Sequence, residues 1–221
     1  MNVSEALRSR YTCRDYKAET VSEETLAAIF AAAIRTPSWA NTQPWEIHVA
    51  GGETLEGLRS ACLDNFKSGV PGNAEFPRPE KWPAALEERM HSLGAARFES
   101  LGIERGDEDA RKAISENNNR FFGAPVVAYL CMDRSLTAWS ILDLGLLAQS
   151  IMLAAEELGV ATSIAYNLVI YPDLIRNALG IPEDQIILIG IALGYAKAES
   201  VQNRFRSPRR PLEEAVSFHG F

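Results

Sequence analysis

The stretch from Trp139 to Leu158 constrains the fold most, because its pattern predicts one long helix that is apolar around much of its circumference. A helix of this kind lies deep in a core or in an interface between subunits. Gly159 follows as a residue that readily adopts the left-handed conformation in which many helices end. Either place, core or interface, makes this helix a central element of the fold or of its assembly. The apolar positions are Ile141, Leu142, Leu144, Leu147, Ile151, Met152, Ala155 and Leu158.

Four short segments have the pattern of β-strands. Trp45 to Ala50 alternates apolar and polar residues, which is typical of a strand with one buried face. Ala124 to Met132 is almost wholly apolar, which is typical of a central strand. Val160 to Tyr166 and Ile186 to Tyr195 are the other two candidates. Short strands among longer helices predict an α+β fold, with helices flanking a mixed or antiparallel central sheet.

Further helices are expected between the strands. Ser22 can cap a helix that ends near Arg35, because Pro37 disfavours helical geometry in the residue before it. A second helix is predicted from about Thr54 to Phe66. A short third helix should cover Pro172 to Leu179, since proline is favoured in a first turn.

Residues 67–119 have a different character from the rest of the chain. The part from Lys67 to Pro83 is rich in proline and glycine and should be irregular. The part from Ala84 to Asn119 is polar and helical in pattern, with glycines that we expect to act as breaks at Gly94, Gly102 and Gly106. We interpret residues 1–221 as a single domain with 67–119 as a helical excursion. The excursion is either a cap over a site or a surface insertion without a role.

The charge distribution favours a small anionic ligand over a polymer. The net charge is −7 and the pI is about 5.1, which argues against general nucleic-acid binding because that needs a basic face. Arginines nevertheless gather near both ends of the chain, although for any one of them exposure to solvent is the simpler explanation. They are Arg8, Arg10 and Arg14, and then Arg204, Arg206, Arg209 and Arg210.

Cysteine usage and hydropathy predict a cytoplasmic protein without a membrane partner. Cys13, Cys62 and Cys131 are odd in number and widely spaced, which is typical of buried, reduced thiols. Charges occur from Glu5 onward, so no signal peptide is visible. Apolar stretches such as Leu144 to Ala155 are too short to span a bilayer.

Several common catalytic motifs are absent. No pair of glycines has the spacing G-x-G, no Gly-Lys pair occurs, and G-x-S-x-G is missing. These absences argue against the dinucleotide fingerprint, a P-loop and an α/β-hydrolase elbow. His48, His91 and His219 are isolated from one another, and each is expected to be structural or at the surface. An enzyme with this profile often takes its reactivity from a cofactor bound in another way.

Two segments have the residue types of a cofactor site. The loop Pro37-Ser38-Trp39-Ala40-Asn41-Thr42-Gln43-Pro44-Trp45 combines amides, which suit the edge of a planar heterocycle, with tryptophans that can stack. In Arg10-Tyr11-Thr12-Cys13-Arg14, an extended backbone would place Arg10, Thr12 and Arg14 on one side. Two guanidinium groups and a hydroxyl suit a phosphate.

With these segments in place, the sequence resembles the FMN-dependent nitroreductase family. The resemblance rests on the Arg-x-Thr-x-Arg segment at 10–14, the Pro-Ser-x-x-Asn-x-Gln-Pro-Trp loop at 37–45, and the basic tail at 206–214. Gly180-Ile181-Pro182-Glu183-Asp184 and the strand that ends in Leu193-Gly194-Tyr195 are also similar to the family. The match covers most of the chain outside 67–119, and it implies a nitroreductase-like fold.

The resemblance implies roles for individual residues. Arg10 and Thr12, with Tyr11 between them, would bind the FMN phosphate, and Arg14 would lie nearer the ribityl chain or the N1/O2 edge of the flavin. Arg206 or Arg209 would reach the phosphate, often from the other subunit of a homodimer. The ribityl and isoalloxazine would be lined by Pro37, Ser38, Trp39, Asn41 and Gln43, and the ring would be passed by Ser163, Ile164 and Ala165.

The implied activity is an FMN-dependent NAD(P)H oxidoreductase of the nitroreductase kind, without a catalytic side chain. NADH or NADPH would be a transient donor, and a nitroaromatic, quinone or similar small acceptor would then take the electrons by a ping-pong hydride mechanism. Trp39 and the pair Ala165-Tyr166 depart from many relatives and leave the acceptor open. The alternatives are a flavin-dependent reductase of another class, such as a dehalogenase or a flavin-consuming enzyme, and a flavin-binding module without turnover.

Overall fold

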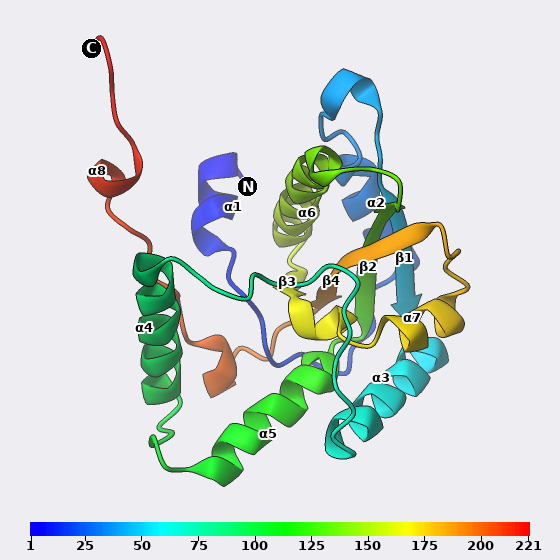
Figure 1. Ribbon diagram of the computed structural model, residues 1–221, viewed down its shortest axis with the longest axis vertical. Helices are drawn as coiled ribbons and strands as arrows, with labels where there is room; N and C mark the ends of the chain where they lie inside the picture. The colour runs from blue at the N-terminus through cyan, green and yellow to red at the C-terminus, as the bar shows by residue number, and fades with distance from the viewer.

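The computed structural model describes all 221 residues, and its centre is a four-stranded antiparallel sheet (Figure 1). The strands are β1 (Glu46–Gly51), β2 (Val126–Asp133), β3 (Ala161–Ala165) and β4 (Gln185–Gly194), in the order β1-β2-β4-β3. The four predicted strands are all present, within two residues of the expected bounds. Together with the helices they confirm the α+β fold class.

Helix α6 (Ala138–Glu157) lies across one face of the sheet beside α2 (Glu23–Ala33). Leu147, Ile151 and Ala155 are fully buried against residues of β2 and β4. By length and composition alone α6 could cross a membrane, which corrects our expectation that every apolar segment is too short. Its inner face is packed on the sheet, however, as in the core helix of a globular domain.

The opposite face of the sheet carries α3 (Gly52–Lys67), α5 (Glu108–Asn119) and α7 (Pro172–Leu179). The α7 bounds are those predicted, and Gly180 ends the helix with φ of 66°. Helix α2 also begins as predicted, because the Ser22 hydroxyl accepts a hydrogen bond from the Thr25 N–H. Short 3-10 helices connect these elements: η1 (Trp39–Asn41), η2 (Phe121–Gly123), η3 (Tyr166–Val169) and η4 (Val201–Asn203).

The two ends of the chain lie on the same side of the molecule. Helix α1 (Val3–Ser9) begins with a capping box between Asn2 and Glu5, and the N-terminal amino group lies 3.5 Å from the Glu157 carboxylate at the end of α6. Sequence analysis did not anticipate α1. The C-terminal tail carries a single turn, α8 (Leu212–Ala215), and then extends away from the sheet.

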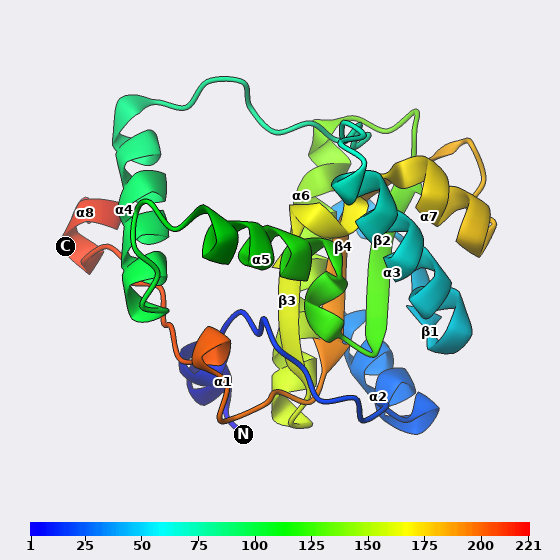
Figure 2. The ribbon, with the colours of Figure 1, turned by 90° about the horizontal axis from the view of Figure 1, so that it is seen from below.

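Residues 68–119 follow two different courses. Helix α4 (Ala84–Ser100) stands apart from the sheet and is joined to α3 by a long extended loop (Figure 2). The expectation that Gly94 breaks this helix was wrong, because α4 continues through it. The loop itself is tied to the sheet, since the Glu75 carboxylate accepts hydrogen bonds from Arg176 (2.9 and 3.0 Å) and from the Ile187 N–H (2.8 Å).

Candidate functional site

Residues 10–14 run alongside the outer edge of β3. Thr12 forms a parallel bridge with Thr162, and the Cys13 N–H donates to the Thr162 carbonyl at 2.9 Å. The segment leaves α1 at Arg10 with an extended conformation. The predicted extended course is therefore present, and β3 supplies the template that holds it.

Six arginines converge on one cavity of about 670 Å³, which we call the arginine cavity. No carboxylate lines this cavity, and none of its arginines takes part in an ion pair. Guanidinium groups that gather without counter-charges form a site for a multiply charged anion such as a phosphate. The arginines are Arg8, Arg10 and Arg14 from the N-terminal segment, Arg97 from α4, and Arg206 and Arg209 from the tail.

One of the tail arginines, Arg206, is held in place by the N-terminal segment that it faces. The Arg206 guanidinium stacks over the Tyr11 ring at 3.7 Å, and it also donates to the Asn203 carbonyl at 2.6 Å. The buried Asn203 side chain accepts from the Arg14 N–H at 2.8 Å and donates to the Asp15 carbonyl at 2.7 Å. Asn203 thus joins the two halves of the cavity. Sequence analysis missed it because no motif includes it.

Arg97 is a second residue that sequence analysis missed. Burial, together with the charge of the neighbouring Arg14, lowers its pKa to about 10. Burial likewise lowers the pKa of Arg14 below its ordinary value. A bound anion would relieve both effects. Arg97 lies on a polar helix far along the chain, and only the folding of α4 over the cavity brings it to the others.

The edge of β3 offers unpaired backbone groups beside this cavity. The Thr162 carbonyl points outward to Cys13, so by the alternation of an antiparallel strand the Ile164 N–H and C=O point outward as well. No strand pairs with β3 on this side beyond Thr12. Ser163 is buried, and its hydroxyl has no hydrogen-bond partner, while Ala165 packs into the core.

The loop at 37–43 is strained and self-supporting. Ala40, Asn41 and Gln43 all adopt positive φ, at 47°, 58° and 47°. Non-glycine residues rarely adopt this conformation, and such strain tends to gather at functional sites. The Gln43 N–H donates to the Ser38 hydroxyl at 2.9 Å, and the Trp39 N–H donates to the Asp143 carboxylate of α6 at 3.3 Å.

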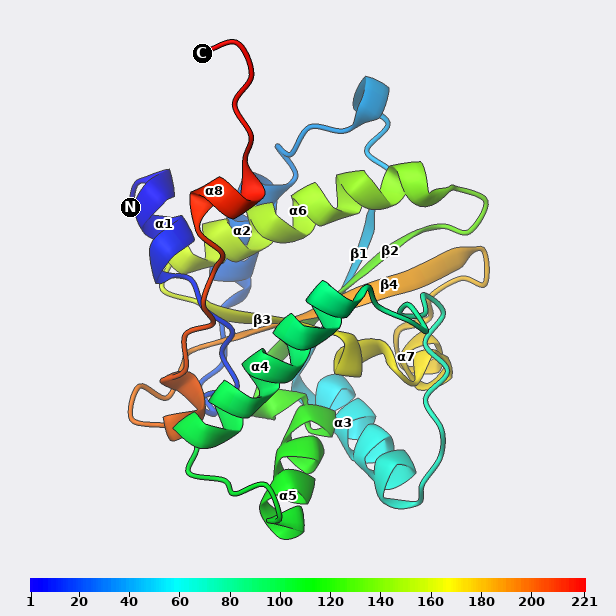
Figure 3. The ribbon, with the colours of Figure 1, turned by 60° about the vertical axis from the view of Figure 1, so that its left-hand side comes forward.

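Within one copy of the chain, this loop lies far from α1 and α4, the helices next to the arginine cavity (Figure 3). The loop is held at Asp143, whereas α1 is held at Glu157, and fourteen residues of helix separate these two anchors by about 21 Å. No residue of 37–43 lines the arginine cavity. The two segments that sequence analysis singled out are therefore not brought together by one chain.

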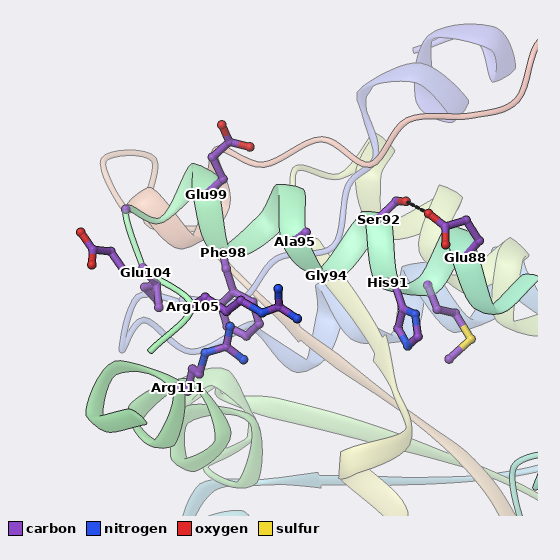
Figure 4. A pocket seen from close by; sticks show the side chains of 13 residues that line it. Glu88, His91, Ser92, Gly94, Ala95, Phe98, Glu99, Glu104, Arg105 and Arg111 are labelled. Atoms are coloured by element: carbon purple, nitrogen blue, oxygen red, sulfur yellow. Dashed lines mark hydrogen bonds between the residues drawn. The ribbon is translucent and has the colours of Figure 1, made fainter. Parts of the chain in front are cut away.

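A second and larger cavity of about 1020 Å³ lies on the other side of α4 (Figure 4). Its charges are mixed, with Arg105 and Arg111 beside Glu99 and Glu104. Arg111 stacks over the Phe98 ring at 4.4 Å. None of the predicted site residues lines it. Because this larger cavity carries both positive and negative charges and lies open between α4 and α5, we do not place the cofactor there.

The cysteines are not activated as nucleophiles, and no metal cluster is present. All three cysteines are buried, and burial raises the pKa of Cys13 to about 11 and the pKa values of Cys62 and Cys131 to about 12. No three His, Cys, Asp or Glu residues form a group that could hold a metal. An α+β domain with an arginine-rich cavity at an open sheet edge belongs to the class that binds an anionic cofactor.

Comparisons with known proteins identify the family within this class. The sequence model of the Nitroreductase family matches residues 7–195, and the chain belongs to this family. It is 32% identical to the nitrobenzene nitroreductase of Ectopseudomonas oleovorans over 98% of this chain and 96% of that one. It is 32% identical to the 4-nitrobenzoate reductase of Pseudomonas putida over 96% and 93%. The FMN and NADPH-dependent nitroreductase NfnB of Sphigopyxis sp. strain HMH shares the fold with a TM-score of 0.92, at 34% identity over the whole of both chains.

Proposed function

We propose that this protein is an FMN-dependent oxidoreductase that transfers electrons from NADPH or NADH to nitroaromatic, quinone or similar electron-poor acceptors. The observation that carries the proposal is the arginine cavity, where six guanidinium groups without a carboxylate partner face one space. The named activities of the relatives support the same reading, since they are nitroreductases and one is described as FMN- and NADPH-dependent.

The residues of the cavity fit FMN by their chemistry. We assign Arg10, Thr12, Arg206 and Arg209 to the phosphate, and we add Arg97 as a fifth donor from α4. The outward N–H and C=O of β3 would meet the hydrogen-bonding edge of the ring. When bound, FMN supplies the hydride chemistry that no side chain of this protein can perform.

Arg14 has a role different from that of the phosphate ligands. Its backbone N–H is fixed by Asn203 and its guanidinium donates to the Thr12 carbonyl at 3.3 Å, so the charge is held close to the β3 edge. We assign Arg14 to the ring, where a cation stabilises the negative charge that reduction creates. The protein's contribution is then to bind the ring, to fix its orientation and to keep one face open to substrates.

A second copy of the chain completes the site in our proposal. Trp139, Leu142 and Leu146 lie on one face of α6 at helical spacing and are 59%, 61% and 43% exposed. An apolar stripe of this kind marks an interface. A homodimer that buries this stripe would cover the outer face of α6 and could bring the loop at 37–43 of one subunit to the arginine cavity of the other. The exposed tail residues Leu212 and Phe218 would contribute to the same contact.

Two substrates would use the open face of the bound cofactor in turn. The donor binds only transiently, which agrees with the absence of a dinucleotide-binding fingerprint from the sequence. After the oxidised donor leaves, the acceptor takes its place in a ping-pong cycle. We place this activity in the cytoplasm, where NADPH and NADH are available and where three free thiols would stay reduced.

The test is a visible spectrum of the purified protein before and after anaerobic addition of NADPH or NADH, followed by a panel of acceptors. We expect a yellow protein that the donor bleaches and that nitrobenzene or a quinone reoxidises. The double variant Arg10→Ala and Arg209→Ala should bind FMN at least about 100-fold more weakly, because two charge-assisted contacts are lost. Arg89→Ala, an exposed arginine of α4 outside the cavity, is the matched control.

The same experiment separates this proposal from its alternatives. A yellow protein that neither donor bleaches would indicate a flavin-binding module without turnover. A protein that the donor bleaches but that reduces only halogenated substrates would indicate a dehalogenase. Full retention of FMN by the folded double variant would overturn the assignment of the arginine cavity to the phosphate.

A further inference from the structure

Arg78 is a cation that no part of the proposed cofactor site uses. Its guanidinium lies over the Tyr166 ring, 4.7 Å from the ring centre, and it forms no ion pair or hydrogen bond within the chain. Tyr166 directly follows Ala165, the last residue of the β3 segment that we assign to the flavin ring. An unpaired positive charge therefore lies next to the end of the strand that we assign to the flavin ring.

The position of Arg78 is fixed by the loop that carries it. Tyr171 donates to the Val70 carbonyl at 3.0 Å, and the Asn73 N–H donates to the Ile170 carbonyl at 2.9 Å. Glu75 is then bound by Arg176 at 2.9 Å. These contacts hold the loop against η3 and α7, and Figure 1 shows the loop passing over η3.

Two prolines stiffen the last step to Arg78. Pro77 and Pro79 flank it, and each fixes its own φ and restricts the residue before it. Gly72 lies so close to Ile170 that a Cβ there would approach the Ile170 Cβ to 3.1 Å. The backbone of the loop therefore has little freedom left to lose on binding. The Arg78 side chain itself is exposed and is accessible to a ligand.

We propose that Arg78, supported by Tyr166, is a specificity-determining residue that selects acceptors carrying a carboxylate or another single negative charge. The proposal rests on the proposed function, because it takes the β3 edge as the place of the flavin ring. The guanidinium lies over the Tyr166 ring and forms no hydrogen bond within the chain, so its N–H groups are free for a two-point hydrogen bond to a carboxylate. A single guanidinium balances the charge of a monoanion. It does not balance the phosphates of NADPH or NADH, which carry more negative charge, so we assign it to the acceptor and not to the donor.

The binding test uses ligands that cannot be reduced. Benzoate and benzamide have similar shapes and differ in charge, and their dissociation constants for the FMN-loaded protein can be measured by calorimetry. We expect Arg78→Gln to weaken benzoate binding about tenfold and to leave benzamide binding unchanged, as for loss of one partly exposed charge-assisted contact. Arg78→Lys should retain part of the preference for benzoate over benzamide, because lysine keeps the positive charge but cannot form the two-point hydrogen bond of a guanidinium.

Lys81→Gln is the matched control, since it removes one exposed positive charge three residues further along the same loop. It should change benzoate binding less than twofold. If Arg78→Gln affects benzoate no more than Lys81→Gln does, or weakens benzamide equally, the inference is overturned. The inference also fails if Arg78→Gln mainly raises the KM for NADPH.

Turnover distinguishes failure of this inference from failure of the proposed function. Arg78→Gln should lower kcat/KM for 4-nitrobenzoate about tenfold relative to nitrobenzene, with an unchanged rate of reduction by NADPH. A protein that reduces both acceptors with a ratio insensitive to Arg78 contradicts only the specificity role. A protein that reduces neither of these acceptors nor a quinone contradicts the proposed function, and the role of Arg78 with it.

Discussion

Replacing Glu75 by glutamine tests whether the loop at 68–83 is held by charge or only by shape. The Glu75 carboxylate is bound by Arg176, by Arg134 and by the Ile187 N–H. The Arg176 side chain is only 8% exposed and that of Glu75 15%, so the pair is screened little by solvent. Glutamine has nearly the same shape but no charge, and its amide NH₂ would face donors.

The expected loss is about 3 kcal/mol of unfolding free energy. Removing one partner of a buried pair costs about 3–5 kcal/mol when the other charge is left uncompensated. Arg176 retains the carbonyls of Ile181 (3.1 Å) and Gln185 (3.0 Å), so we take the lower end of this range. For a chain of this size, about 3 kcal/mol corresponds to a decrease in Tm of roughly 6–12 °C.

Thermal unfolding with saturating FMN at one fixed protein concentration measures this loss, because ligand and subunit concentrations both shift Tm. Glu80→Gln on the same loop is the control, since Glu80 is exposed and forms no ion pair, and it should change the unfolding free energy by less than about 0.5 kcal/mol. A Tm of Glu75→Gln within 2 °C of the unchanged protein would refute the reasoning.

The pH dependence gives an independent check on the same carboxylate. Burial alone would raise the pKa of Glu75, but the hydrogen bonds from Ile187 and Arg134 and the charge of Arg176 outweigh it and hold the pKa below its ordinary value of 4.5. The stabilisation is therefore complete above about pH 4.5 and is lost as the pH falls through the lower folded-state pKa. The Tm difference between the protein and Glu75→Gln should shrink in that acidic range.

Three further predictions concern assembly, strain and the thiols. Leu142→Arg should convert the dimer to monomers without unfolding it, because this side chain is 61% exposed in one copy; sedimentation velocity measures this, and a persisting dimer would contradict the α6 interface. Ala40→Gly should raise Tm by roughly 1–4 °C, because glycine adopts a φ of 47° without strain, and the strain relieved exceeds the extra entropy that glycine loses on folding. A lower Tm in thermal unfolding would count against strain in this loop. Cys13, Cys62 and Cys131 should resist iodoacetamide at pH 8 until denaturant is added, because burial raises their pKa values; mass spectrometry of the native protein showing rapid labelling would contradict this.

The sequence predicted the elements well wherever a local pattern decides them. Ser22, Pro172 and Gly180 mark helix ends through their own side chains and backbone preferences, and the structure places the ends within two residues of the predictions. Gly94 was misjudged because one glycine costs a helix only about 1 kcal/mol, which the rest of α4 outweighs. Local pattern is therefore a better guide to helix ends than to helix interruptions.

The sequence indicated some of the arginines that line the cavity, but not how they are arranged. Arg10 and Arg14 stand out in one basic cluster and Arg206 in another, and the cavity brings the two clusters together. Arg97 and Asn203 could not, since they join the cavity only through the course of α4 and of the tail. No pattern in one sequence records which distant helix will cover a given arginine.

The position of the strained loop gives α6 a role beyond its place in the core. One end of α6 fixes the loop through Asp143, and the other end fixes α1, from which the Arg10–Arg14 segment leaves. The helix keeps these two anchors about 21 Å apart in one copy. The same helix presents an apolar outer face that a second copy can cover. If that face is the interface, the α6 helices of the two subunits pack against each other. The loop at 37–43 of one subunit can then meet the arginines of the other, because each segment is attached to one of these helices. Dimer formation would then both bury Leu142 and complete the cofactor site. A variant that separates the subunits, such as Leu142→Arg, should therefore also release FMN.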